Sequence, residues 1–94
     1  MGKRIVVAED QTPQRERLGF ILKKEGYGVF EAENGVIALE HIQREGLDLL
    51  VTDIGMPEMD GLTLITLLGE RGYNVPVIVC SGLLFDPCCV RYYS

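Results

Sequence analysis

Short apolar stretches alternate along the chain with segments whose apolar residues recur at the spacing of a helix. Residues 4–8 and 47–53 are rich in Val, Leu and Ile, and each stretch gives way to carboxylates at its end. Residues 27–32 and 75–81 have the composition of two further strands. Short continuous apolar runs are typical of strands that are buried on both faces of a parallel sheet.

Three helices are predicted between these strands. The first is expected to have Thr12 as its N-cap and Pro13 at its first position, and the second and third follow Asn34 and Asp60, which are also good N-caps. Glycines supply the expected stop signals at Gly26, Gly46 and Gly72. The residues expected on the apolar faces are Leu18, Ile21 and Leu22 in the first helix, Ala38, Leu39 and Ile42 in the second, and Leu64, Ile65, Leu67 and Leu68 in the third.

Helices that alternate with strands at these spacings predict right-handed βαβ units and a parallel, doubly wound α/β sheet. One domain is expected, because 94 residues suffice for a single small core. Ligands of such sheets collect at the carboxyl ends of the strands. The polar residues expected at those ends are Glu9, Asp10, Asp53 and Ser81.

Composition narrows the range of partners. Nine Lys and Arg against fourteen Asp and Glu give a net charge of −5, which is unlike a surface that binds nucleic-acid phosphates. The apolar run at residues 5–8 is too short for a signal peptide or a membrane span. Cys80, Cys88 and Cys89 lack metal-site spacing and fit a reduced, cytoplasmic setting. Protein or small-molecule partners are therefore expected.

The carboxylates at neighbouring strand ends indicate a cation site. Two like charges about 4 Å apart repel by roughly 4 kcal/mol at an effective dielectric of about 20. Oxygen ligands suit Mg²⁺, which binds through one or two carboxylates and commonly assists phosphate chemistry. Taken singly, the pair Glu9-Asp10 fits a turn or helix cap, Asp53 an Asx turn, and Ser81 an ordinary strand end. Their expected convergence at one edge of the sheet favours a cation site over these separate structural roles.

Three motifs in this order have a counterpart in a known family. They are the acidic pair Glu9-Asp10, the stretch Asp-Ile-Gly-Met-Pro-Glu-Met-Asp-Gly at residues 53–61, and Ser81-Gly82. The combination resembles the response-regulator receiver domain of two-component phosphorelays. The resemblance implies a flavodoxin-like sheet of strand order 2-1-3-4 in one receiver domain over residues 1–94. Residues 1–82 match the family, and residues 83–94 form an atypical tail.

The resemblance also implies a role for each site residue. Asp53 would be the nucleophile that takes a phosphoryl group from a sensor histidine kinase or a phosphotransfer protein, forming an acyl phosphate. Asp10 and Asp53 would hold Mg²⁺ together with the backbone carbonyl of Gly55, and Glu9 would hold a water bound to the metal. Ser81 would hydrogen-bond a phosphoryl oxygen. Output would pass by contact to a downstream protein partner.

The C-terminal part departs from the family pattern. A receiver normally has a fifth strand with a lysine and a fifth helix, and neither is recognisable here. The three lysines, Lys3, Lys23 and Lys24, all precede Asp53. Residues 88–93 have strand-like composition but follow the fourth strand too closely for a parallel crossover, which needs about a dozen residues. The fourth strand is therefore expected to leave an unpaired apolar edge.

That edge leaves the oligomeric state and the function open. A homodimer would cover the edge with the partner's tail; the alternatives are a tail without ordered structure, or a C-terminus that is shortened or altered in frame. The preferred function is a phospho-accepting signalling domain, whose catalysis would extend at most to its own aspartate. The alternative is a pseudo-receiver that acts as a dimerisation or docking module without phosphotransfer. A haloacid-dehalogenase-type phosphohydrolase is disfavoured, because Gly55 stands where that class has a second Asp.

Overall fold

The computed structural model describes residues 3–53, 58–73, 75–80 and 92–93. These residues form a five-stranded sheet of order β2-β1-β3-β4-β5. Its strands are β1 (Arg4–Ala8), β2 (Gly28–Ala32), β3 (Leu49–Asp53), β4 (Val77–Cys80) and β5 (Tyr92–Tyr93). Strands β1 to β4 run parallel, which confirms the predicted 2-1-3-4 order.

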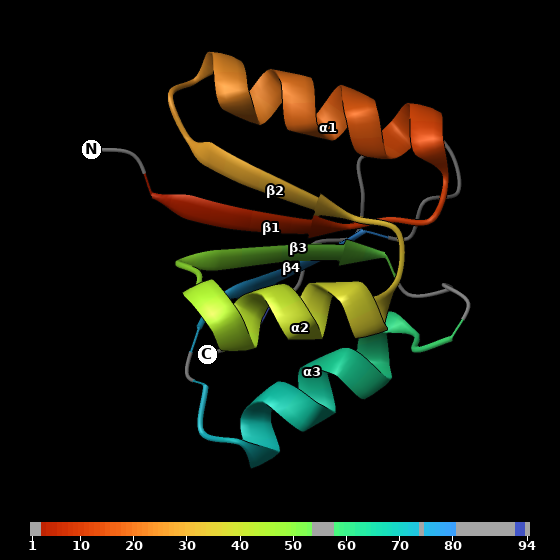
Figure 1. The fold of residues 1–94 in the computed structure, drawn as a ribbon, viewed down its shortest axis with the longest axis vertical. Coiled ribbons are helices and arrows are strands. Elements are labelled where there is room, and N and C mark those ends of the chain that lie inside the picture. The colour runs from red at the N-terminus through yellow and green to blue at the C-terminus, as the bar shows by residue number, and fades with distance from the viewer. Residues whose placement is uncertain (1–2, 54–57, 74, 81–91, 94) are drawn as a thin grey trace.

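Helices cover both faces of this sheet (Figure 1). Helix α1 (Thr12–Lys24) lies on one face, and α2 (Gly35–Glu45) and α3 (Gly61–Glu70) lie together on the other. The predicted doubly wound α/β architecture is therefore confirmed. Within the described ranges, the chain has no helix that is long and apolar enough to cross a membrane.

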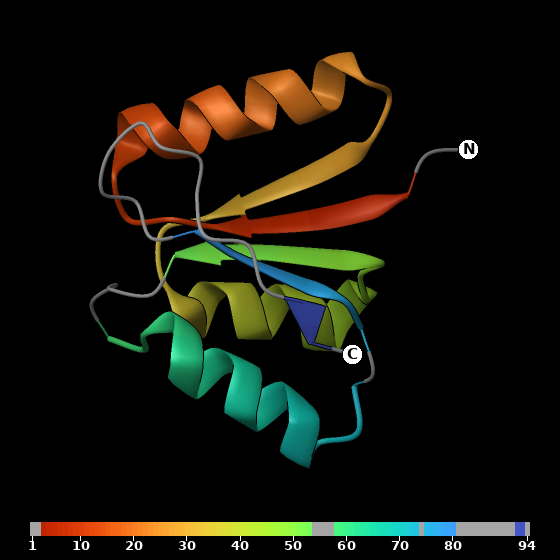
Figure 2. The same cartoon turned by 180° about the vertical axis from the view of Figure 1, so that it is seen from behind.

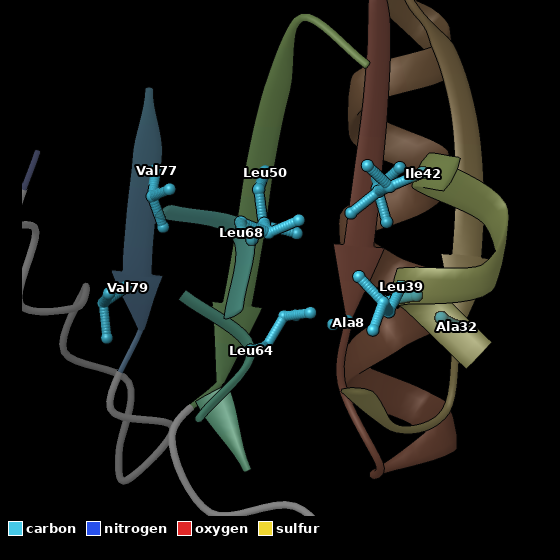
Figure 3. Close-up of a cluster of buried hydrophobic side chains, with 11 residues drawn as sticks. Ala8, Ala32, Leu39, Ile42, Leu50, Leu64, Leu68, Val77 and Val79 are labelled. Atoms are coloured by element: carbon cyan, nitrogen blue, oxygen red, sulfur yellow. The ribbon is translucent and has the colours of Figure 1, made fainter. Parts of the chain in front are cut away.

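The sheet separates two apolar clusters. Along β1, Val6 and Ala8 point toward α2 and α3, whereas Ile5 and Val7 point toward α1. All four side chains are buried, so this strand needs apolar residues at every position rather than at alternate ones. The larger cluster, shown in Figure 3, consists of Val6, Ala8, Ala32, Ala38, Leu39, Ile42, Leu50, Leu64, Leu68, Val77 and Val79.

Two of the predicted helix caps are present. The Oδ1 of Asn34 accepts a hydrogen bond from the backbone N–H of Ile37 at 2.9 Å. The Oδ1 of Asp60 accepts one from the N–H of Thr63 at 2.8 Å, and this bond holds the pKa of Asp60 below its usual value. Each cap satisfies a helix N–H group that has no partner within its own helix.

The start of α1 differs from the prediction. Gln11 is the N-cap residue and makes no side-chain capping bond, so the assignment of Thr12 as N-cap is wrong. Thr12 is the first helical residue, which moves Pro13 from the expected first position to the second. The Thr12 hydroxyl instead accepts a hydrogen bond from Nη2 of Arg15 at 3.3 Å. The hydroxyl oxygen that was expected to cap the helix therefore binds the side chain of Arg15, one turn further along.

The sheet-facing side of α1 also differs in part. Leu18 and Leu22 pack against the sheet as expected, but Ile21 is 49% exposed. The side that faces the sheet also includes Gly19, which is buried, and Arg15, which is half-buried. These positions are spaced i, i+3, i+4 and i+7, which defines one helix face and turns Ile21 away from the sheet.

The edge of β4 is paired within the chain, contrary to prediction. Strand β5 lies antiparallel to β4, with Val77 opposite Tyr93 and Ile78 opposite Tyr92 (Figure 2). The expectation of an unpaired edge considered only a parallel crossover. An antiparallel strand needs only a reversal of the chain. The pairing therefore removes much of the reason for expecting a partner copy at this edge.

A close contact joins the start of α2 to the loop before α3. The backbone N–H of Gly35 donates to the carbonyl oxygen of Met59 at 3.2 Å. A Cβ added at Gly35 would lie 2.5 Å from that oxygen and 2.9 Å from the Met59 side chain. Glycine is required here by close packing of two backbones.

We expect Gly35→Ala to lower the free energy of unfolding by about 1–3 kcal/mol, because the backbone at Met59 must move to admit the methyl group. Urea denaturation measures this change. Gly69→Ala is the matched control, since a Cβ at Gly69 would meet nothing within 4 Å. The control should be neutral or stabilising by up to about 1 kcal/mol. Equal stability changes in the two variants would contradict the contact.

Candidate functional site

Three carboxylates meet at the carboxyl edge of the parallel sheet. Ala8 and Thr52 are register partners on β1 and β3, so the residues that follow them, Glu9 and Asp53, emerge beside each other. Asp10 is next along the chain. One carboxylate oxygen from each of the three acidic residues lies within 4.8 Å of the other two. The structure thus brings together Glu9, Asp10 and Asp53, as their positions in the sequence led us to expect.

These carboxylates are unequally exposed. Glu9 is only 3% exposed and Asp53 9%, whereas Asp10 is half-buried. The Oε2 of Glu9 accepts a hydrogen bond from the backbone N–H of Gln11 at 3.0 Å. The site therefore has a buried floor, formed by Glu9 and Asp53, with Asp10 at its more accessible side.

The backbone at Glu9 is fixed on two sides. Its N–H donates to the carbonyl oxygen of Ala32 at 3.0 Å, which extends the pairing of β1 with β2. Its carbonyl oxygen accepts a hydrogen bond from Nη1 of Arg15 at 2.9 Å. Sequence reasoning missed this use of Arg15. The available signal was its position three residues before Leu18 and seven before Leu22, on the sheet-facing side of α1.

Burial raises the pKa of Glu9 to about 7 in the metal-free protein, and repulsion from Asp53 and Asp10 adds to the increase. The N–H of Gln11 acts in the opposite direction, because it stabilises the ionised carboxylate. At neutral pH the metal-free cluster therefore carries fewer than three full negative charges. A proton on Glu9 reduces the repulsion among the three carboxylates, as a bound cation would.

The donor set suits a small, hard cation. Mg²⁺ prefers oxygen ligands at about 2.0–2.1 Å, so two oxygens that share the ion lie roughly 3–4 Å apart. The three carboxylate oxygens lie within 4.8 Å of one another, so small side-chain rotations would bring them into this range, and waters would supply further ligands. The residues present therefore fit Mg²⁺. Gly55 and Ser81, the other predicted site residues, lie outside the described residues.

The parallel sheet of order 2-1-3-4 and the acidic cluster at its carboxyl edge place this chain among the doubly wound α/β proteins. The family model of the response regulator receiver domain matches residues 5–91, and the chain belongs to this family. It is a receiver domain of the kind found in two-component response regulators.

Individual relatives agree with this assignment. The chain is 41% identical to the response regulator receiver protein CpdR of Brucella abortus, over 85% of this chain and 67% of the relative. It is 38% identical to the response regulator GtcR of Aneurinibacillus migulanus over 87% of this chain, but spans only 34% of that protein. The solved response regulator TrrA of Thermotoga maritima, in complex with Mg(2+)-BeF, superimposes with a TM-score of 0.78 at 35% identity. That superposition covers 83% of this chain and 68% of TrrA.

The raised pKa of Glu9 predicts a pH-dependent stability of the metal-free protein. Between the ordinary glutamate pKa of 4.5 and the folded value of about 7, the folded state binds more protons than the unfolded state. This difference in proton binding adds to the free energy of unfolding. The contribution is fully present below about pH 4.5 and is lost as the pH rises through about 7. Glu9→Gln removes this titration, so we expect the variant to be more stable than the wild type at pH 8.

Chemical denaturation in EDTA at pH 5 and pH 8 measures this difference. The variant's advantage should be much smaller at pH 5, where Glu9 is protonated in most folded molecules. Glu40→Gln is a suitable control, since Glu40 is exposed on α2 and outside the cluster. A Glu9→Gln advantage that is the same at both pH values would contradict the proposed titration.

Proposed function

We propose that Asp53 accepts a phosphoryl group from a sensor histidine kinase or a phosphotransfer protein, with Mg²⁺ held by the neighbouring carboxylates. The observation that carries this proposal is the cluster itself: oxygens of Glu9, Asp10 and Asp53 within 4.8 Å of one another, at the ligand-binding edge of the sheet. Membership of the receiver family and the Mg(2+)-BeF complex of TrrA support it.

Asp53 would act as the nucleophile in this proposal. It is the last residue of β3, whose backbone pairs with β1 on one side and with β4 on the other. In the proposed step, a carboxylate oxygen of Asp53 forms a bond to phosphorus. The bond from phosphorus to the donor histidine nitrogen breaks, and its electron pair leaves with the imidazole. The rigid central strand limits movement of the nucleophile during this transfer.

The other carboxylates would serve the cation. Asp10 and Asp53 would ligate Mg²⁺ directly together with the carbonyl oxygen of Gly55, and Glu9 would act through a water. When bound, Mg²⁺ neutralises charge on the carboxylates and on the incoming phosphoryl oxygens, which is much of what phosphoryl transfer requires. The burial of Glu9 and Asp53 strengthens this electrostatic contribution, because it excludes screening water.

Ser81 would hydrogen-bond a phosphoryl oxygen in this proposal. Residues 54–94 contain no lysine that could serve as a second cationic partner of the phosphoryl group. On this observation the second candidate function is a pseudo-receiver, which would dock to a protein partner without being phosphorylated.

Downstream signalling would proceed through contact with another protein, in the cytoplasm. Homodimerisation is a second mode of association, although β5 already pairs with part of the β4 edge that a partner copy would cover. Light scattering at micromolar concentration distinguishes a monomer from a dimer.

A phosphorylation-independent docking module should retain its partner when Asp53 is replaced by Ala, whereas a phosphorylation-dependent one should lose it.

Incubation with Mg²⁺ and acetyl phosphate should add the mass of one phosphoryl group to the wild-type protein. Asp53→Asn keeps the size of the side chain but lacks the nucleophilic carboxylate, and it should show no gain. Intact-protein mass spectrometry makes the comparison, and EDTA should suppress the gain in the wild type. Circular dichroism of both proteins controls for folding.

The alternatives give different patterns in the same experiment. A folded wild-type protein that gains no mass would favour the pseudo-receiver. An equal gain in wild type and Asp53→Asn would place the modification on another residue and contradict the assignment of Asp53.

A further inference from the structure

An ion pair joins α1 to β2 close to the carboxylate cluster. Glu31 is the register partner of Val7, whose side chain packs on the α1 side of the sheet. The Oε1 of Glu31 lies 3.9 Å from Nε of Arg15, and its Oε2 lies 3.6 Å from Nζ of Lys23. The side chain of Arg15 is 15% exposed and that of Lys23 57% exposed. The more protected ion pair is therefore the one with Arg15.

All three guanidinium nitrogens of Arg15 have partners. Besides the Nε contact with Glu31, Nη1 donates to the carbonyl oxygen of Glu9 at 2.9 Å and Nη2 to the Thr12 hydroxyl at 3.3 Å. Because a guanidinium is planar and its donor directions are fixed, a shift of one partner changes the geometry of its contacts with the others. Arg15 thus connects Glu31 on β2 to the turn that carries the acidic pair.

The direction of the Glu9 carbonyl constrains the backbone at the next residue. It belongs to the rigid peptide plane that links Glu9 to Asp10, so fixing its direction restricts where the Asp10 side chain can point. The geometry points to Arg15 as a positioning residue for Asp10: it holds the Glu9 carbonyl so that the Asp10 carboxylate faces Asp53. The functional value of this role rests on the proposed function, in which Asp10 is a ligand of Mg²⁺.

Gly19 makes room for this arrangement. It is buried on the sheet-facing side of α1, and a Cβ added there would overlap the Glu31 carboxylate. That carboxylate is the far end of a flexible side chain, so it can move away from the methyl group of Gly19→Ala at low cost. The substitution therefore displaces the anchor of Arg15 without changing any charge, and it places the better helix former inside α1.

Three variants test the role of Arg15. Arg15→Met removes the guanidinium and keeps an aliphatic stem. Gly19→Ala displaces Glu31 at constant charge. Lys23→Met is the matched control, because it removes one positive charge beside the same Glu31 carboxylate and Lys23 is too exposed to support it strongly. Two measurements apply to each: Mg²⁺ affinity by NMR titration, and the backbone order parameter of the Asp10 amide in the metal-free protein.

We expect Arg15→Met to weaken Mg²⁺ binding about tenfold, the scale on which groups that orient metal ligands act. Loss of a nearby positive charge would by itself strengthen cation binding, so weaker binding can be separated from a simple charge effect. Gly19→Ala should weaken binding less but in the same direction, while the protein remains at least as stable to denaturant. The Asp10 order parameter should fall in both variants, and Lys23→Met should match the wild type in both measurements.

The results separate this inference from the proposed function. If the wild type does not bind Mg²⁺ but the Asp10 order parameter falls in Arg15→Met and Gly19→Ala, the positioning role stands and the proposed function fails. If the wild type binds Mg²⁺ and the order parameter is unchanged in both variants, the positioning role is overturned. Unchanged or tighter Mg²⁺ binding by Arg15→Met also overturns it.

Discussion

Burial of β1 and β3 between two layers of helices is the constraint on which the carboxylate site depends. Oxygens of Glu9, Asp10 and Asp53 lie within 4.8 Å of one another, and each pair of charges at such a distance costs roughly 3–4 kcal/mol at an effective dielectric of about 20. The fold sustains this cost because Glu9 and Asp53 are attached to β1 and β3, whose apolar side chains are buried on both faces of the sheet. Core packing therefore holds the charges together, and a proton or cation relieves the repulsion.

The two layers of helices contribute differently to the site. Helices α2 and α3 cover the larger apolar cluster, and the contact of Gly35 with Met59 links the start of α2 to the loop that precedes α3. Helix α1 packs fewer apolar residues and presents Arg15 toward the turn after β1. One face of the sheet thus provides most of the apolar burial, and the other adjusts the backbone that carries Glu9 and Asp10.

Much of the fold and the acidic cluster could be predicted from the sequence, because both depend on local patterns. Uninterrupted apolar strands imply burial on both faces, and parallel strands place Glu9 and Asp53 at one edge. The errors arose where a particular contact, one local and one distant in sequence, decided the outcome. The Thr12 hydroxyl accepts a hydrogen bond from Arg15 instead of capping the helix, and the β4 edge is paired by an antiparallel strand. Neither contact follows from helix propensity or strand composition.

The distribution of positive charge around the cluster follows from the same contacts. The guanidinium nitrogens of Arg15 are directed to the Glu9 carbonyl, the Thr12 hydroxyl and the Glu31 carboxylate, so this cation supports the backbone beside the cluster. A proton at Glu9 lowers the negative charge of the cluster, as a metal ion bound in the proposed site would. Because the pKa of Glu9 is about 7, this proton is exchanged near neutral pH, and a metal ion in the proposed site would compete with it. Burial of one carboxylate would thereby couple proton occupancy to metal occupancy.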